Sequence, residues 1–161
     1  MAEIDRIIAE MGPALLRAAA AYERDPGLRE DLLQEMLIAI ARALPKLRDP
    51  ARLRPFVFRI AHNKGVDHVA RHAGGPETEE ASEDLPRPDG SPEEHLIDVQ
   101  RAQRLRAAVR RLELPYRQVI ALLLEDLTYA EIAESLGISV SNVGVRINRA
   151  KALLRSLLDH G

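Results

Sequence analysis

An all-α fold of two small helical domains is predicted by three features of the sequence. Aromatic residues make up 3% of the 161 residues and Trp is absent, so the core has to be built from Leu, Ile, Val and Ala. Apolar residues recur at the spacing of amphipathic helices, and no segment alternates as a strand would. A stretch rich in Gly, Pro, Ser and acidic residues separates two helical halves. We expect domains over residues 1–73 and 93–161, joined by a flexible acidic linker over residues 74–92.

Three helices are expected in the first half. Residues 4–22 have a helical pattern, although Gly12-Pro13 should kink or divide it. Asp25-Pro26 supplies a cap and a proline at the first position of a second helix, which Pro45 stops. A loop follows, and Pro55 then fits the first turn of a third helix that continues to about His72.

The second half begins with the signals of a helix start. Ser91-Pro92-Glu93-Glu94 combines a Ser cap with acidic residues in the first turn, and the helix should end near Leu114-Pro115. A short helix over residues 116–125 follows.

A helix-turn-helix is predicted next. Thr128 and Glu131 form a capping box for a helix over residues 129–136, and Gly137 suits the left-handed position at its end. Ser139 caps the final helix. Two helices joined by such a turn are typical of DNA-binding domains.

One face of the final helix is apolar and the other is polar and basic. Four basic residues and no acidic residue lie between Asn142 and Arg155. The open face suits phosphate anchoring and contact with base edges, and it carries Ser141, Asn142, Val145, Arg146 and Arg149. The alternative is an amphipathic helix with a solvated basic face.

The net charge of −2 is unevenly distributed. Residues 76–98 hold nine acidic side chains and one Arg, which leaves 22 basic and 16 acidic residues in the rest of the chain. The two halves outside this stretch are therefore basic. Basic domains favour a polyanionic partner, even though the overall charge is slightly negative.

Several classes of protein are excluded by what the sequence lacks. There is no Cys for a disulfide, a thiolate metal site or a nucleophile. No apolar run approaches the roughly 18 residues that span a bilayer, and no secretory signal opens the chain, so we expect a cytoplasmic protein without membrane insertion. No nucleophile-elbow or phosphate-loop pattern is present, so we expect no catalytic residues and no cofactor. His62, His68 and His72 suggest a metal site, but the chain offers no obvious further ligand and we expect none.

The helix-turn-helix and the residues before it carry a family pattern. Residues 127–151 read LTYAEIAESLGISVSNVGVRINRAK, and residues 112–119 read LELPYRQV. Both resemble region 4 of bacterial RNA polymerase sigma factors of the extracytoplasmic-function type, although related helix-turn-helices occur in response regulators.

The first half supplies independent matches. The segment DLLQEM from Asp31 resembles region 2.2 of the same sigma factors. The segment RIAHN from Arg59, followed by Asp67 and Arg71, resembles regions 2.3 and 2.4. Together the matches cover nearly the whole chain outside the linker, in the family's order.

The resemblance implies a sigma factor with a region 2 bundle of three to four helices and a region 4 helix-turn-helix. Its partners would be promoter DNA, an anti-sigma factor and core RNA polymerase, through the clamp helices of the largest subunit and the flap of the second largest. Asp31, Gln34 and Glu35 would meet the clamp helices, and the acidic linker would thread the polymerase's basic cleft.

The resemblance also implies how promoter DNA is read. Region 4 would read the −35 element as duplex, through Ser139, Ser141, Asn142, Val145, Arg146 and Arg149. Region 2 would capture unstacked −10 bases, through Arg48, Phe56, Arg59, Asn63, Asp67 and Arg71, with the loop over residues 46–54 as a wall of the base pocket.

The spacing of the predicted −10 residues is compatible with this role. Arg59, Asn63, Asp67 and Arg71 recur every four residues and so lie along one helix face. The Asn amide has both donors and an acceptor for the edge of an unstacked base, and the Arg residues can hold phosphates. The alternative is a solvated face in which Asp67 pairs with Arg71.

Three departures from the family pattern stand out. Phe56 replaces a Trp, and His62 replaces a common Arg. Gly144 and Val145 stand where Lys and Ser are usual, and Gly144 should weaken the helix by about 1 kcal/mol.

Two other functions are weighed against the sigma factor. A stand-alone helix-turn-helix regulator would leave the segment from Asp31 and the face around Asn63 without a role. A sigma mimic that sequesters an anti-sigma factor would usually carry a receiver domain, which this sequence lacks.

Overall fold

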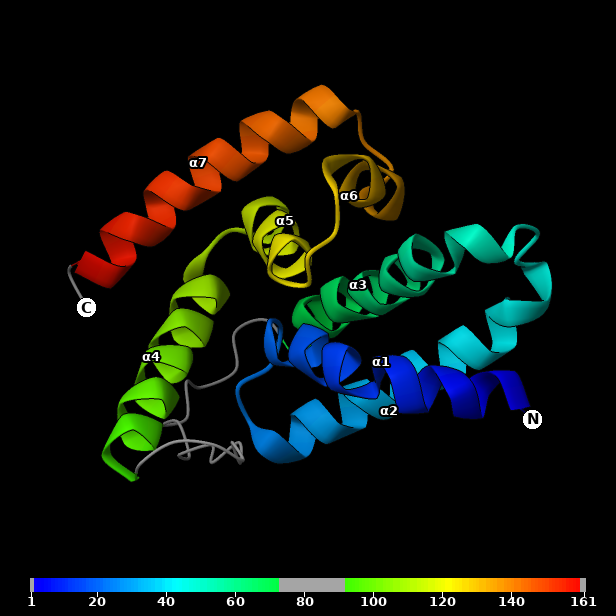
Figure 1. Ribbon diagram of the computed structural model, residues 1–161, viewed down its shortest axis with the longest axis horizontal. Helices are drawn as coiled ribbons and strands as arrows, with labels where there is room; N and C mark the ends of the chain where they lie inside the picture. Colours follow the sequence, from blue (N-terminus) through cyan, green and yellow to red (C-terminus); the bar gives the residue numbers. More distant parts are fainter. Residues whose placement is uncertain (1, 73–91, 160–161) are drawn as a thin grey trace.

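The computed structural model describes residues 2–72 and 92–159, which form seven α-helices, two short 3-10 helices and no strand (Figure 1). The helices are α1 (Ala2–Ala20), α2 (Pro26–Ala43), α3 (Leu53–Arg71), α4 (Pro92–Arg111), α5 (Leu114–Leu124), α6 (Tyr129–Leu136) and α7 (Val140–Asp159). The 3-10 helices are η1 (Leu44–Lys46) and η2 (Pro50–Arg52). The predicted all-α class is confirmed. The predicted linker, apart from Pro92, lies outside the described residues.

Helices α1, α2 and α3 pack on one another in the first half. Their core is mostly aliphatic, with Leu15, Leu32, Met36 and Ile40 fully buried together with the ring of Phe58. Asp25 caps α2 as predicted, because its carboxylate accepts a hydrogen bond of 2.9 Å from the backbone N–H of Leu28. These contacts make α1–α3 a three-helix unit.

Helix α1 is not divided at Gly12-Pro13, because it runs without interruption through Pro13. A proline inside a helix removes the hydrogen bond to the carbonyl four residues earlier, here that of Ala9. Both Ala9 and Pro13 are exposed, so water can solvate that carbonyl. Helix α3 begins at Leu53 and so has Pro55 in its first turn, as predicted.

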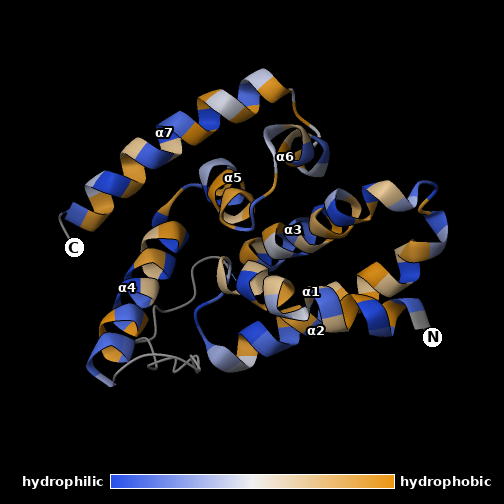
Figure 2. Cartoon of the chain, in the orientation of Figure 1, coloured by the Kyte–Doolittle hydropathy of each residue, from blue (hydrophilic) through white to orange (hydrophobic). Residues whose placement is uncertain are grey.

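Helices α4–α7 form the second half, in which α7 packs against α5, α6 and α4. Leu122 of α5, Ile132 of α6, and Val143 and Ile147 of α7 are fully buried. Figure 2 shows hydrophobic and hydrophilic residues alternating in bands along each helix, as amphipathic packing requires.

The two halves share one continuous hydrophobic core, and α3 packs against α6 and α5 (Figure 1). The sequence predicted two domains and left open whether they pack on each other. None of the described helices is long and apolar enough to cross a membrane.

Candidate nucleic-acid interface

The turn between α6 and α7 is built as the sequence predicted. The Thr128 hydroxyl accepts a hydrogen bond from the Glu131 N–H at 3.1 Å, and the Glu131 carboxylate accepts one from the Thr128 N–H at 2.9 Å. Gly137 has φ 68° and ψ 35°, a left-handed conformation that a side chain disfavours. The Ser139 hydroxyl accepts from the Asn142 N–H at 3.1 Å and caps α7. The turn therefore fixes the start of α7.

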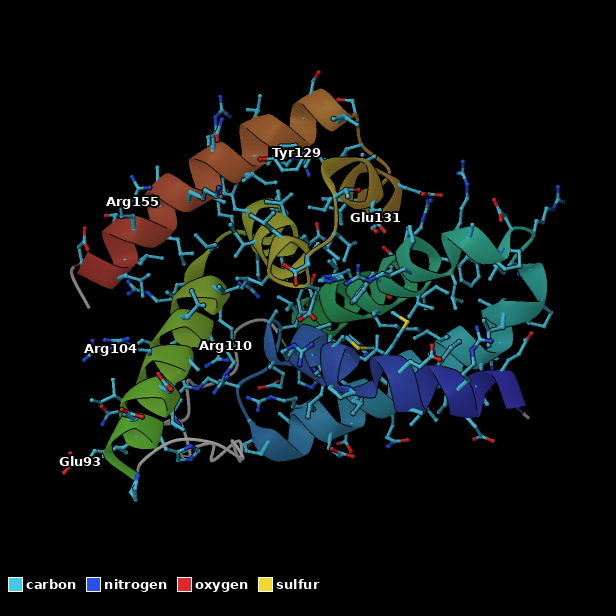
Figure 3. All side chains as sticks on the ribbon, in the orientation of Figure 1. Glu93, Arg104, Arg110, Tyr129, Glu131 and Arg155 are labelled. Carbon is cyan, nitrogen blue, oxygen red and sulfur yellow. The ribbon has the colours of Figure 1, made fainter. Side chains whose placement is uncertain are left out.

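Helix α7 buries one face and leaves the predicted −35 residues on the other. Its core residues Val143, Ile147 and Ala150 are fully buried. Arg146 is half-buried, and the remaining predicted residues are exposed: Ser139, Ser141, Asn142, Val145 and Arg149. Figure 3 shows Arg155, near the other end of α7, pointing away from the body of the protein. The open face of α7 thus carries polar and basic side chains together with the exposed Val145.

Helix α3 exposes three of the predicted −10 residues, Arg59, Asn63 and Asp67. The fourth, Arg71, is exposed too, but it does not pair with Asp67 as the solvated-face alternative supposed. Its guanidinium instead donates to the Glu35 carboxylate of α2 at 2.9 Å. The polar face of α3 is therefore linked to the predicted polymerase-binding residues.

The predicted polymerase-binding residues lie together on α2. Asp31 and Gln34 are exposed, and Glu35 is half-buried beside Arg71. Since they lie within five residues of a regular helix, they form one contiguous polar patch.

The loop before α3 lines a cavity of about 130 Å³ together with the start of α1. The residues around it are Glu3, Arg6, Ile7, Leu44, Leu47, Pro50 and Leu53. Arg48 is exposed on the same loop, while Phe56 is half-buried at the start of α3. Neither lines the cavity, so the structure does not bring the predicted base-gripping side chains together there.

His62 is a buried core residue. It is 1% exposed, and its Nδ1 is hydrogen-bonded to the Tyr22 hydroxyl. Burial lowers the pKa of His62 to about 4, and burial raises the pKa of the Tyr22 hydroxyl. The imidazole of His62 is therefore neutral at neutral pH.

The other two histidines that were considered for a metal site, His68 and His72, also have protein partners. His68 Nε2 lies 2.8 Å from the Glu23 carboxylate, and His72 Nδ1 lies 2.9 Å from the His68 carbonyl oxygen. Within residues 2–72 and 92–159, no group of three His, Cys, Asp or Glu residues could hold a metal ion.

Contacts between the two halves were not predicted from the sequence. Arg17 of α1 makes two hydrogen bonds of 2.7 Å to the Glu125 carboxylate, which raises the pKa of the Arg17 guanidinium. Arg52 of η2 donates to the Glu134 carboxylate at 2.8 Å, and Arg54 of α3 donates to the Glu125 carbonyl oxygen. These partners are 71 to 108 residues apart in the sequence, so no local spacing could have revealed them.

Two family models match the chain. Residues 7–74 match sigma-70 region 2, and residues 102–154 match sigma-70 region 4. The first match covers most of α1 together with α2 and α3, and the second covers the second half of α4, all of α5 and α6, and most of α7.

Two curated relatives are similar over most of their length. An ECF RNA polymerase sigma factor of Streptomyces griseus, ShbA, is 33% identical over 166 residues, which cover 95% of this chain and 86% of the relative. The RNA polymerase sigma factor SigZ of Bacillus subtilis is 29% identical over 136 residues, which cover 84% of this chain and 75% of the relative.

Two solved structures share the fold. CnrH, solved in complex with the cytosolic domain of CnrY, superposes with a TM-score of 0.70 at 28% identity, over 98% of this chain and 88% of that one. The sigma factor RpoE from Bartonella quintana was solved with the anti-sigma factor NepR. It superposes with a TM-score of 0.76 at 20% identity, over 99% of this chain and 98% of that one. With both regions matched in order and a relative aligned over nearly its full length, this chain belongs to the sigma-70 family as an RNA polymerase sigma factor of the extracytoplasmic-function type.

Proposed function

We propose that this sigma factor reads the −35 element with the open face of α7 and captures −10 bases on the polar face of α3, while the α2 patch binds core RNA polymerase. The observation that carries the proposal is the row of exposed Arg59, Asn63 and Asp67 on α3, in the same chain as an exposed helix-turn-helix. A stand-alone helix-turn-helix regulator would leave these exposed residues of α3 without a function.

Helix α7 carries groups suited to duplex DNA. Ser139 and Ser141 lie at its N-terminus, where backbone N–H groups and short hydroxyls favour a phosphate. Asn142 can make two hydrogen bonds to an adenine edge, and the exposed Val145 suits contact with a thymine methyl group. Arg146 and Arg149 supply the positive charge that binding to phosphates requires.

The α3 face carries groups suited to unpaired bases. The Asn63 amide offers donors and an acceptor to a base edge, and Arg59 supplies charge for the backbone. Capture of an unstacked base offsets the few kcal/mol that unpairing costs. In this proposal Arg48 and Phe56 border the same strand, from the loop and from the start of α3.

The partners in this proposal are macromolecular. The α2 patch meets the clamp helices of the largest polymerase subunit, and the second half meets the flap of the second largest. An anti-sigma factor belongs to the proposal because one structural relative, RpoE, was solved with the anti-sigma factor NepR, and the other, CnrH, with the cytosolic domain of CnrY. The site of action is the cytoplasm, where transcription takes place.

Binding to core polymerase is the first test. We expect Gln34→Ala/Glu35→Ala to weaken binding to bacterial core RNA polymerase at least tenfold, because two polar contacts are lost at once. Quantitative pull-down of the full-length chain measures the effect. Arg71→Ala is the matched control, since it removes the Arg71–Glu35 ion pair but leaves the α2 patch intact.

Either of two results would contradict the proposal. If Arg71→Ala weakens binding as much as the double variant does, the ion pair and not the patch is responsible. If the wild-type chain does not bind core polymerase at all, a stand-alone regulator or a sigma mimic becomes the better description.

Substitutions on α7 test the reading of the −35 element. We expect Arg149→Ala to weaken duplex binding across all sequences and to lower the salt dependence by about one phosphate contact. Asn142→Ala should instead relax the preference at one base pair. Holoenzyme reconstituted with each variant is used to select from a duplex library randomised over the −35 region.

Arg155→Ala is the control for the loss of one positive charge on α7, because Arg155 lies far from the N-terminal turns (Figure 3). It should retain wild-type affinity and selection. Equal losses for Arg155→Ala and Arg149→Ala would show that net charge, and not a specific contact, governs binding.

A further inference from the structure

The first six residues of α7 carry no positive charge. The basic residues of this helix all follow Val145, and they are Arg146, Arg149, Lys151 and Arg155. In a helix-turn-helix the N-terminal residues of the second helix lie deepest in the major groove, while the first helix crosses the DNA backbone. The part of α7 that would lie closest to DNA therefore has no cation to hold a phosphate.

A tyrosine of α6 lies beside this part of α7. A Cβ on Gly144 would lie 3.8 Å from Cε2 of Tyr129, the first residue of α6. Because Cε2 is bonded to the carbon that carries the hydroxyl, the hydroxyl end of the ring lies along the flank of α7 at Gly144. Figure 3 shows Tyr129 between α6 and α7. Gly144 has no side chain, so it leaves this flank of α7 open next to the ring.

The Tyr129 side chain is available to a ligand. It is 40% exposed, and its hydroxyl has no hydrogen-bond partner within residues 2–72 and 92–159. The capping box engages other donors at the start of α6, since the Thr128 N–H is bonded to the Glu131 carboxylate and the Glu131 N–H to the Thr128 hydroxyl. The Tyr129 hydroxyl is therefore a side-chain donor that the fold itself does not use.

Resting on the proposed function, we propose that Tyr129 is a −35 contact residue, whose hydroxyl donates a hydrogen bond to a phosphate of the duplex beside Gly144. Tyrosine is one of the side chains that bind DNA phosphates, and its hydroxyl is a neutral donor. Salt dependence arises when cationic side chains displace counterions from the duplex. A neutral donor displaces none, so Tyr129 adds affinity for the −35 duplex without adding to the salt dependence.

Removal of the hydroxyl alone tests the contact. Tyr129→Phe keeps the ring beside Gly144 and leaves the capping box intact. We expect it to weaken binding of the holoenzyme to a −35 duplex about fivefold, the effect of one hydrogen bond, and to leave the slope of log affinity against log salt unchanged. The duplex carries the sequence that wild-type holoenzyme selects from the randomised library, and fluorescence anisotropy at several salt concentrations measures the affinity.

Tyr116→Phe is the matched control. Tyr116 of α5 is half-buried and packs against the hydrophobic core, so the loss of its hydroxyl should leave the affinity unchanged. Equal losses for the two variants, or wild-type affinity for Tyr129→Phe, would overturn the contact and leave the proposed function standing. If wild-type holoenzyme selects no −35 sequence at all, the proposed function is overturned and this contact with it.

Modified phosphates identify the group that Tyr129 binds. In a series of duplexes, one phosphate at a time is replaced by a methylphosphonate, which has a methyl group in place of an acceptor oxygen. We expect one position at which the replacement weakens binding of the wild type but has no further effect on Tyr129→Phe. Arg149→Ala should remain sensitive at that position. If the wild type and Tyr129→Phe respond alike at every position, a phosphate is not the acceptor.

Gly144→Lys tests whether the contact stands in for a cation. A lysine there places a positive charge on the same flank of α7, so the slope of log affinity against log salt should steepen by about 0.9, the value for one phosphate contact. Tyr129→Phe should then weaken binding less than about twofold, because the lysine holds the same phosphate. Gly144→Ala should keep the wild-type slope and the full effect of Tyr129→Phe. An unchanged slope in Gly144→Lys, or an undiminished effect of Tyr129→Phe there, would overturn the shared phosphate.

Discussion

Gly65→Ala is expected to destabilise the protein by about 1–3 kcal/mol, although alanine is the better helix former. A Cβ at Gly65 would lie 2.3 Å from a ring carbon of Tyr22, well inside van der Waals contact. The ring has little room to move, because it is 5% exposed, its hydroxyl is bonded to His62, and Arg117 lies 6.0 Å from its centroid. Urea denaturation measures the free energy of unfolding.

Gly144→Ala is the matched control, because Gly144 also lies within a helix but a Cβ there would be 3.8 Å from the Tyr129 ring, an ordinary contact. We expect it to stabilise α7 by about 0.5–1 kcal/mol. Gly65→Ala should also cost much less in a Tyr22→Leu background, where the ring is gone. A loss that is independent of Tyr22 would assign the effect to something other than this contact.

Lowering the pH from 7.5 to 4 is expected to reduce the free energy of unfolding by about 3 kcal/mol through the protonation of His62 alone. Burial lowers the pKa of His62 from 6.5 to about 4, so the unfolded chain binds the proton more tightly than the folded one. The stabilisation is fully present above pH 6.5 and is lost as the pH falls towards 4, below which both states are protonated. The measurement is the free energy of unfolding between pH 7.5 and pH 4.

His62→Gln separates this effect from other titrations, since an amide cannot titrate but can still form a hydrogen bond with the Tyr22 hydroxyl as donor or acceptor. Its stability should fall with acid by about 3 kcal/mol less than that of the wild type. Glu23, whose carboxylate receives hydrogen bonds from the Asp25 N–H and from His68, has a lowered pKa despite its partial burial and contributes at more acidic pH in both proteins. Parallel pH profiles would show that His62 is not the titrating group.

Local patterns predicted the helices and their ends well. The Asp25 cap, the Thr128–Glu131 capping box and the left-handed Gly137 each depend on residues within four positions of one another, and each was confirmed. The continuous course of α1 was not predicted, because the effect of Pro13 depends on whether water reaches the carbonyl of Ala9.

Contacts between distant segments were beyond the reach of sequence patterns. Nothing near Gly65 shows that Tyr22 covers it, and nothing near Arg71 favours Glu35 over Asp67, which is closer in the sequence. The same holds for Arg17 and Glu125, which meet because α1 and the end of α5 are neighbours only in the folded chain. The exposed faces of α3 and α7 were predicted, whereas the packing of one half on the other was not.

The ion pair between Arg71 and Glu35 makes two binding events thermodynamically linked. In the proposed roles, polymerase takes Glu35 and DNA takes Arg71, so whichever ligand arrives first breaks the pair and removes that cost for the second. Linkage is reciprocal: the factor by which polymerase improves the affinity for the −10 strand equals the factor by which that strand improves the affinity for polymerase. In the proposed roles, this one ion pair, with its atoms 2.9 Å apart, makes the chain bind promoter DNA more tightly when polymerase is bound, and polymerase more tightly when DNA is bound.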